Sequence, residues 1–351
     1  EDVRRALIDT AQKIEELEES YDALETLFKG VQNKKDSESY IQYLSDEQKR
    51  DQFYKEFRAF VKNLDECLSL HDFAHKFSSL DIYKRELKRY AELRQSAQLK
   101  YADRKDLSDY KTQLVKILDE YVDAEKVEML TGQININDKA AFDEALEDLG
   151  SSKSKAEAIA AQMQRTITEK AHADPEFYGR FSEKIQKILS EMRVGKLADI
   201  EALKKMKEAR DQLVDKKDET LPPMIATVPG ADIFYRNLRA NFERVGISQD
   251  AFNEIILDMV AILKKEAIID WQRQIDTQRI MKSKIDDYLY DEVQKKRGIA
   301  LDSDAIRDIL DRALALALEN PEYFSWNKNA SSTATTPTNI IWCSKIEKQS
   351  V

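Results

Sequence analysis

The first proline of this chain is Pro175, so the first half of the sequence lacks the residue that most strongly interrupts a helix. Glycine is also scarce, with 8 in 351 residues. Because proline and glycine are the residues that most destabilise helix interiors, this chain can form long, unbroken helices. The sequence therefore predicts an all-α fold, an irregular multi-lobed helical assembly with little or no sheet.

The first section of the chain repeats apolar residues at three- and four-residue intervals, the period of an amphipathic helix. Its opening helix is predicted to end at Gly30, which suits a C-terminal cap. A second helix is predicted to begin at Ser45, whose hydroxyl can cap the third amide while Gln48 reaches back. Further helices are expected around 81–96 and 104–125, and an acidic one from Lys139 to Leu149.

Interruptions in this pattern divide the chain into five predicted parts. Gly150-Ser151-Ser152 breaks the helices and marks a hinge or domain edge. Three prolines between 221 and 230 mark a second boundary. The parts are a first helical section, a second helical section, a Pro-rich linker, a C-terminal helical domain and a flexible tail with a short apolar end, over 1–150, 151–220, 221–230, 231–326 and 327–351.

Two short segments depart from the helical period. Residues 131–137 alternate apolar and polar side chains, as a strand does. The apolar run Ile340-Ile341-Trp342-Cys343 is expected to dock as an edge strand or hook. Little sheet is predicted beyond 131–137 and 339–343.

Net charge and hydropathy exclude some classes of function. The chain carries 56 Lys and Arg against 66 Asp and Glu, a net charge of −10, which argues against a surface that grips nucleic acid over its whole extent. No stretch approaches the roughly 18 apolar residues of a membrane span, and no signal segment opens the chain, so a cytoplasmic location and no membrane partner are expected. Because the chain begins at Glu1 without methionine and enters helical sequence at once, we expect a piece of a larger protein.

Motifs for catalysis and cofactor binding are absent from the sequence. The dispersed glycines form neither a G-x-x-x-x-G-K-[ST] phosphate loop nor a G-x-G-x-x-G turn, and no G-x-S-x-G elbow occurs. The Glu-x-Lys triplets, which begin at Glu47 and Glu86, precede the first proline and cannot follow a Pro-Asp as a metal-dependent nuclease requires. The sequence therefore predicts no catalytic, cofactor-binding or metal-binding residue.

Cys67, His71 and His75 are the most suggestive cluster, because a spacing of four places them on one side of a helix. Adjacent members could bind one metal ion, whereas all three are too far apart along the axis. These residues also extend an apolar stripe that contains Phe60 and Leu64, which favours a core or boundary position.

Charged runs are interpreted first as solvated helix faces. The acidic pair Asp286-Asp287 could in principle act as acid and base, but carboxylates are abundant in this chain. Several basic runs could contact phosphate groups, although ordinary surface is the simpler interpretation: Lys84-Arg85, Lys88-Arg89, Lys204-Lys205 with Lys207, and Lys295-Lys296-Arg297.

Several short segments of the sequence resemble a known family. Their residues, order and separation resemble the C-terminal helical region of type I restriction enzyme R subunits, over about residues 40 to 300 of this chain. The segments are Val122-Asp123-Ala124-Glu125, Thr166-Ile167-Thr168-Glu169-Lys170, Asp174-Pro175-Glu176-Phe177-Tyr178-Gly179-Arg180-Phe181-Ser182, Asp270-Trp271-Gln272 and Ile285-Asp286-Asp287-Tyr288-Leu289-Tyr290-Asp291.

The resemblance implies a bacterial parent enzyme that translocates DNA with ATP and Mg²⁺ and cuts it with a nuclease domain, both upstream of this chain. It implies a non-catalytic role here: the 1–150 section packs on the motor, and the 231–326 domain docks on the modification (methyltransferase) subunit. DNA would be held through the full complex. The alternatives are a free-standing helical scaffold or tether and, third, an enzyme in its own right.

Large aromatic side chains mark the predicted partner contacts. Aromatic rings are enriched at the centres of protein interfaces, although burial within the domain competes with that role for each ring. The candidate contact residues are Trp271, Tyr288, Tyr290, Phe324 and Trp326.

The motif search generates a first testable prediction. We expect the purified chain neither to hydrolyse ATP nor to cleave DNA, because it lacks a phosphate loop and a nuclease motif. Phosphate release and plasmid nicking assays measure both activities. Turnover of ATP that is lost on mutating a residue within the chain would contradict the prediction.

Overall fold

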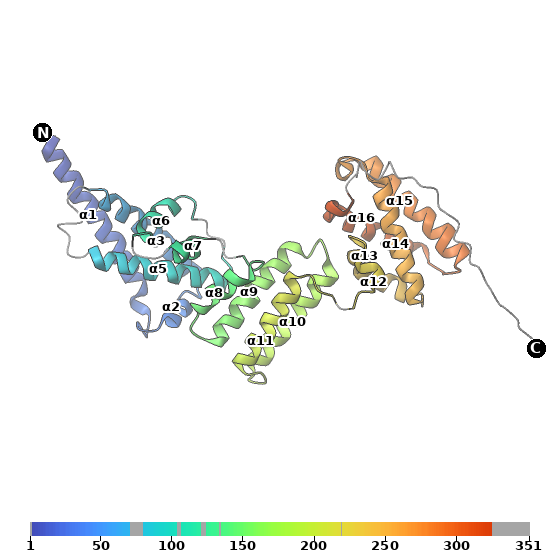
Figure 1. Cartoon of the computed structure of the whole chain (residues 1–351), viewed down its shortest axis with the longest axis horizontal. Coiled ribbons are helices and arrows are strands. Elements are labelled where there is room, and N and C mark those ends of the chain that lie inside the picture. The colour runs from blue at the N-terminus through green and yellow to red at the C-terminus, as the bar shows by residue number, and fades with distance from the viewer. Residues whose placement is uncertain are drawn as a thin grey trace, which may run out of the picture. The chain divides into compact units, whose positions relative to one another are not determined.

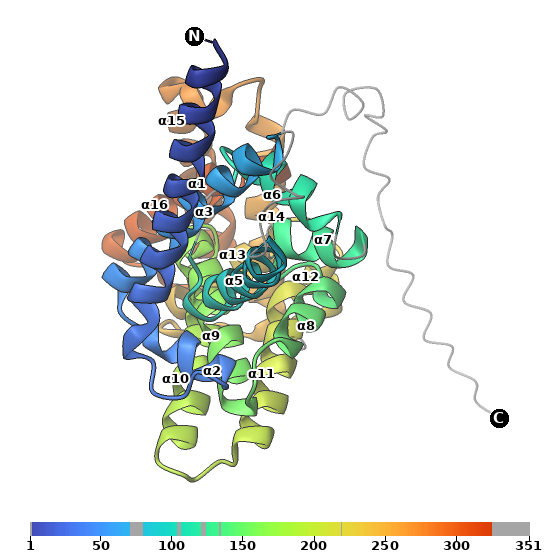
Figure 2. The ribbon, with the colours of Figure 1, turned by 90° about the vertical axis from the view of Figure 1, so that its left-hand side faces the viewer.

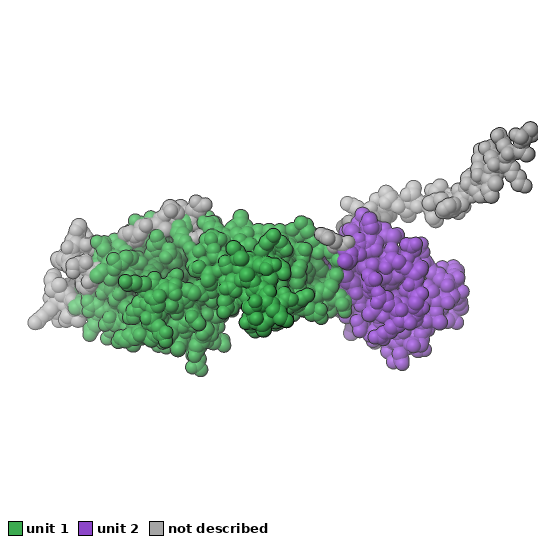
Figure 3. Space-filling model, turned by 90° about the horizontal axis from the view of Figure 1, so that it is seen from below, with its two compact units in different colours: residues 1–171, 175–219 green, residues 172–174, 220–351 purple. Residues whose placement is uncertain are grey.

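The computed structural model describes residues 2–70, 80–103, 107–120, 124–132, 135–218 and 220–324 (Figure 1). Within these residues every regular element is a helix and no strand occurs, which confirms the predicted all-α class. The chain forms two compact units, shown in separate colours in Figure 3. Unit 1 contains residues 1–171 and 175–219, and unit 2 contains residues 172–174 and 220–351.

Unit 1 is built from long helices joined by short helices and turns. In chain order these are α1 (Asp2–Leu27), the 3₁₀ helix η1 (Phe28–Gly30), α2 (Ser37–Tyr43), α3 (Glu47–Leu68), α5 (Leu80–Tyr101), α6 (Lys111–Leu118), α7 (Ala124–Thr131), α8 (Lys139–Glu147), α9 (Ser152–Lys170), α10 (Pro175–Arg193) and α11 (Asp199–Val214). Helix α1 packs on α3, and α9 packs on α5, α10 and α11.

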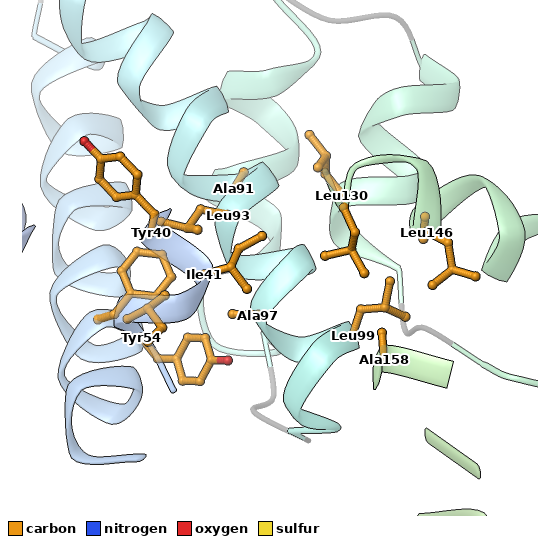
Figure 4. Close-up of a cluster of buried hydrophobic side chains, with 14 of the residues drawn as sticks. Tyr40, Ile41, Tyr54, Ala91, Leu93, Ala97, Leu99, Leu130, Leu146 and Ala158 are labelled. Atoms are coloured by element: carbon orange, nitrogen blue, oxygen red, sulfur yellow. The ribbon is translucent and has the colours of Figure 1, made fainter. Parts of the chain in front are cut away.

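Helix α5 occupies the centre of unit 1, with α1 and α3 to one side and α7 and α8 to the other (Figure 2). Five consecutive residues, 93–97, are buried, so neighbouring helices cover this part of α5 on every side. Figure 4 shows Leu93 and Leu99 of α5 with Ile41 of α2 on one side and Leu146 of α8 on the other. The apolar core of unit 1 therefore forms around α5.

The predicted domain edge at 150 does not divide the structure. One hydrophobic cluster contains residues from both sides of it. Ser151 instead caps α9, its hydroxyl accepting from the Ser154 amide at 3.1 Å. The guanidinium of Arg210 in α11, which is 2% exposed, pairs with the Asp143 carboxylate of α8 at 2.7 Å across the predicted edge.

Local corrections concern the ends of the predicted helices. Helix α3 is capped by Asp46 rather than Ser45, because the Asp46 carboxylate accepts from the amides of the second and third helical residues, Gln48 and Lys49. Gly30 has no left-handed cap conformation; the Tyr43 ring lies 3.0 Å from where a Cβ would stand, so a larger residue there would have to displace the ring.

The predicted strand over 131–137 is wrong for the residues that are described. Thr131 ends α7, and its hydroxyl donates to the carbonyl of Val127. Residues 136–137 form a turn, after which Asp138 caps α8 by accepting from the Ala141 amide. The described part of the segment is therefore a helix end and a turn, while 339–343 lies outside the described residues.

Unit 2 is a smaller helical cluster. Its elements are α12 (Pro223–Ala226), α13 (Ala231–Glu243), α14 (Gln249–Glu266), η2 (Trp271–Arg273), α15 (Ile275–Tyr288), the π-helix η3 (Leu289–Lys296), α16 (Ser303–Glu319) and η4 (Pro321–Phe324). The segment predicted as a linker over 221–230 instead carries α12, with Ile225 fully buried, and Gly230 at a φ of 84° before α13. It is therefore part of the unit 2 core.

The turn between α9 and α10 also belongs to unit 2. The Asp174 carboxylate accepts from Arg236 Nε at 2.9 Å and from Asn237 Nδ2 at 2.7 Å, and both members of the Asp174–Arg236 pair are less than 10% exposed. Asn320 Nδ2 donates to the Ala173 carbonyl at 2.8 Å. These bonds fix three residues of the turn, 172–174, in the second unit.

The Arg210–Asp143 pair generates a prediction about acid stability. Partial burial acts to raise the pKa of Asp143, but hydrogen bonds and charge from Arg210 and Lys207 hold this pKa below its ordinary value. A depressed carboxylate pKa stabilises the fold above about pH 4 and loses that effect as the pH falls through the folded-state value. We expect Asp143→Asn to lower the unfolding temperature at pH 7 and the difference to shrink below pH 4.

Circular dichroism melts at neutral and acidic pH measure this difference. Glu208→Gln is the control, because Glu208 is exposed on the same helix as Arg210 and forms no ion pair within the described residues. An equal loss for Asp143→Asn at both pH values would contradict the assignment.

Candidate partner-binding surface

Two of the predicted contact residues lie in the interior of unit 2. Trp271 follows α14 through Asp270, whose φ of 56° turns the chain sharply, and the indole is fully buried. Its Nε1 donates to the carbonyl oxygen of Phe324 at 2.9 Å. The Phe324 ring is also fully buried and packs on Phe234, with ring centroids 5.6 Å apart. This burial corrects the prediction for Trp271 and Phe324, because neither side chain reaches the surface of this fold.

The other three candidate contact residues have different environments. Tyr288 is partly buried, and its hydroxyl donates to Asp258 Oδ2 at 2.6 Å; burial, then this carboxylate, raises the pKa of Tyr288. Tyr290 is 54% exposed, with Lys295 Nζ 4.2 Å from its ring centroid. Trp326 lies outside the described residues. Of the five, Tyr290 is therefore the ring that the described surface presents most openly.

Helix α15 and η3 keep a strict spacing of four between their buried side chains. Four residues advance an α-helix about 40° beyond a full turn, so this spacing alone would rotate the stripe away from the core. The π-helix η3 has more residues per turn and turns the stripe back. The stripe is Thr277, Met281, Ile285, Leu289 and Val293.

The same stretch of unit 2 also carries exposed apolar side chains. Among the described residues, nine large apolar side chains are exposed, and five of them lie between 268 and 290. We call these five the docking face. They are Ile268, Ile269, Ile275, Ile280 and Tyr290, with exposed fractions of 43, 64, 64, 49 and 54%.

Sequence reasoning found only Tyr290 of the docking face. The predicted contacts were all aromatic rings, so they did not include the four isoleucines. A signal was present for two of them: Ile275 and Ile280 fall between the positions of the four-residue register that runs through Thr277 and Met281. A register assigned from that stripe would have placed them in water.

The described residues contain no group of three or more His, Cys, Asp and Glu side chains that could hold a metal ion. Cys67 is buried, its thiol donates to the Lys13 carbonyl, and burial raises its pKa to about 11, so it is a poor nucleophile and ligand at neutral pH. His71 and His75 lie outside the described residues, so the core or boundary position predicted for them stays a prediction and the metal pair stays its alternative.

The charged runs lie among oppositely charged neighbours. Arg89 pairs with Glu86 at 2.6 Å, and Lys295 and Lys296 pair with acidic residues four positions earlier. Asp286 and Asp287 are both exposed on α15. These arrangements match solvated helix faces.

One cluster in unit 1 combines a hydroxyl, an ammonium group and a carboxylate. Lys100 Nζ lies 2.5 Å from Ser154 Oγ and 2.8 Å from Glu38 Oε1, and Ser154 also bonds to Glu38. Ser154 is only 2% exposed, so a substrate cannot reach its hydroxyl in this fold. The cluster therefore joins α2, α5 and α9 rather than forming a catalytic site.

The chain matches no protein-family model, no curated protein and no solved structure. Among the described helices, none has the length and apolar character needed to cross a membrane. The geometry of the two units therefore carries the functional argument.

Burial of Trp271 generates a prediction about stability. We expect Trp271→Phe to destabilise unit 2 by about 1–3 kcal/mol, because it leaves the buried Phe324 carbonyl without its donor. Amide hydrogen exchange in α14 and α16 of the whole chain measures the change. The exposed Tyr290→Phe is the control and is expected to change stability by less than about 0.5 kcal/mol. Unchanged exchange in Trp271→Phe would show that this indole is not part of the core.

Proposed function

We propose that this chain is the C-terminal, non-catalytic helical region of the R subunit of an ATP-dependent type I restriction endonuclease. In this role it anchors the DNA-translocating and cleaving subunit to the modification methyltransferase core. The docking face of unit 2 is the contact surface. The parent enzyme would use ATP and Mg²⁺ in upstream domains and work in the bacterial cytoplasm.

The observation that carries this proposal is the concentration of exposed apolar side chains in one short stretch of unit 2. Clustered apolar surface that water surrounds is characteristic of protein interaction sites, whereas single exposed apolar residues are ordinary. Burying a side chain such as Ile269 or Ile275 contributes roughly 1.5–3 kcal/mol before the costs of association. Several together suffice for a stable contact.

Charged side chains accompany the apolar residues of the docking face. Asp276 pairs with Arg279 at 3.3 Å and Lys284 with Asp287 at 3.9 Å, and all four side chains are more than half exposed. Exposed pairs of this kind contribute little to stability, so their members can exchange partners on binding. This polar surround suits the rim of an interface.

The sequence segments that resemble R subunits also support a contact in this region of unit 2. Trp271 belongs to one matching segment, and Ile285 and Leu289 belong to another; all three are buried in the same stretch of unit 2 that carries the docking face. Tyr290, from the second segment, is exposed upon it. The matching segments therefore contain buried residues of this region and one residue of the docking face, Tyr290.

A free-standing helical scaffold is the alternative function. Tethers of this class are usually built from repeated units of one size. Units 1 and 2 differ in helix number, length and topology, and no internal repeat occurs in the sequence. We therefore favour a specific docking region.

A binding experiment tests the proposal. The intact chain is used to capture the methyltransferase core of the parent system, and its affinity is compared with that of Ile269→Lys/Ile275→Lys. We expect this variant to bind at least tenfold more weakly, since two interface residues would become charged. The matched control is Val194→Lys/Ile200→Lys, which changes side chains in unit 1 that are 67 and 73% exposed, and is expected to bind normally.

Two outcomes would contradict the proposal. Failure of the intact chain to capture the methyltransferase core would remove the anchoring role. Normal capture by the Ile269→Lys/Ile275→Lys variant would place the contact elsewhere on the chain.

A further inference from the structure

Unit 1 contains a cavity of about 790 Å³ near the C-terminal end of α5. Its described walls come from α5, the start of α6, residues 131–132 and 135–137, and the last turns of α9. This volume lies within the range of small-molecule binding sites, roughly 300–1,000 Å³. No sequence motif marks this cavity, because its walls come from four separate segments.

Cationic side chains outnumber carboxylates in these walls. Arg94, Lys111, Arg165 and Lys170 face two carboxylates, Asp103 and Glu169. The excess is notable because the chain as a whole carries a net charge of −10. Arg94 is 2% exposed, so its charge is carried in a region of low water content, where it acts more strongly on a ligand than a surface charge does.

Both carboxylates already accept hydrogen bonds from basic side chains. Asp103 Oδ2 accepts from Arg50 Nε and from the Tyr54 hydroxyl, each at 2.9 Å. Glu169 Oε1 accepts from Arg165 Nε at 3.1 Å. Since Arg50 contributes a further positive charge behind Asp103, the carboxylates do not cancel the positive charge of the walls.

The carbonyl groups at the end of α5 are also occupied. A helix C-terminus repels anions through its unpaired carbonyl oxygens. Here Gln162 Nε2 donates to the carbonyls of Gln98 and Leu99, and Arg165 Nη1 donates to that of Ala102 at 2.7 Å. These bonds offset the repulsion that the helix end would exert on an anion in the cavity.

Lys111 and Lys170 supply positive charge at the exposed edge of the cavity. Both are exposed, and neither forms an ion pair with another residue of the described ranges. A lysine ammonium group is a flexible point charge that suits phosphate oxygens. Two such groups on separate helices can approach one phosphate from different sides.

We infer that this cavity binds a small phosphorylated ligand, a nucleotide or a pyrophosphate-like anion. Lys111 and Lys170 contact the phosphate groups at the edge, and Arg94 and Arg165 provide positive charge deeper in the walls. This site is independent of the docking face, which lies in unit 2.

Thermal unfolding of the intact chain with added ATP, AMP, pyrophosphate or inorganic phosphate tests the inference, followed by calorimetric titration of the best probe. A ligand that binds only the folded state raises the unfolding temperature with its concentration. Stabilisation by pyrophosphate as well as ATP would identify the phosphate groups as the recognised part; stabilisation by ATP alone would show that the nucleoside contributes. Either result supports the site if charge reversal at Lys111 and Lys170 weakens the binding.

Charge reversal locates the site. Lys111→Glu/Lys170→Glu is expected to weaken binding at least tenfold, and the neutral Lys111→Gln/Lys170→Gln to weaken it less. The control Lys187→Glu/Lys204→Glu makes the same charge change at exposed positions of α10 and α11 and is expected to bind normally. The inference is overturned if none of the probes stabilises the chain, if both charge-reversed variants bind alike, or if short duplex DNA is bound by the same lysines in place of the small probes.

Discussion

The burial of residues 93–97 of α5 on every side is the constraint on which unit 1 depends. A helix in this position is normally apolar all round, yet α5 places Arg94, Gln95 and Ser96 in the interior. Buried polar groups must be hydrogen-bonded or paired, so the surrounding helices have to supply matching groups. Helix α9 does so for the end of α5 through Gln162 and Arg165. The same polar requirement leaves a charged cavity beside an otherwise apolar core.

The all-α fold class and most of the long helices could be predicted from the sequence. The helical period of apolar residues and the scarcity of proline can both be read from the sequence alone. The N-terminus of α3 shows the limit of such reasoning. Both Ser45 and Asp46 are good N-cap residues, and only the backbone geometry selects Asp46. The strand prediction over 131–137 failed because Thr131 continues α7 and residues 136–137 form the turn that precedes α8, which alternation of apolar and polar residues does not reveal.

The candidate surface was less predictable, because exposure depends on which neighbours cover a residue. Trp271 and Tyr290 are both large aromatic rings in one sequence region. The Trp271 ring is buried and donates a hydrogen bond to the Phe324 carbonyl, whereas the Tyr290 ring stays exposed. Nothing local to Trp271 reveals a partner 53 positions later. The cavity beside α5 could not be predicted for the same reason, since Arg94 and Lys170 are far apart in the sequence and line one cavity only in the folded unit.

The anchoring of residues 172–174 in unit 2 makes that unit discontinuous along the chain, with α10 and α11 inserted between its two pieces. During synthesis from the N-terminus, unit 1 can assemble as it emerges, whereas Asp174 has to wait until Arg236 and Asn237 have been made. The nascent turn therefore carries a carboxylate without its final cation for the whole of that interval. A chain cut at residue 220 would keep it in that state permanently.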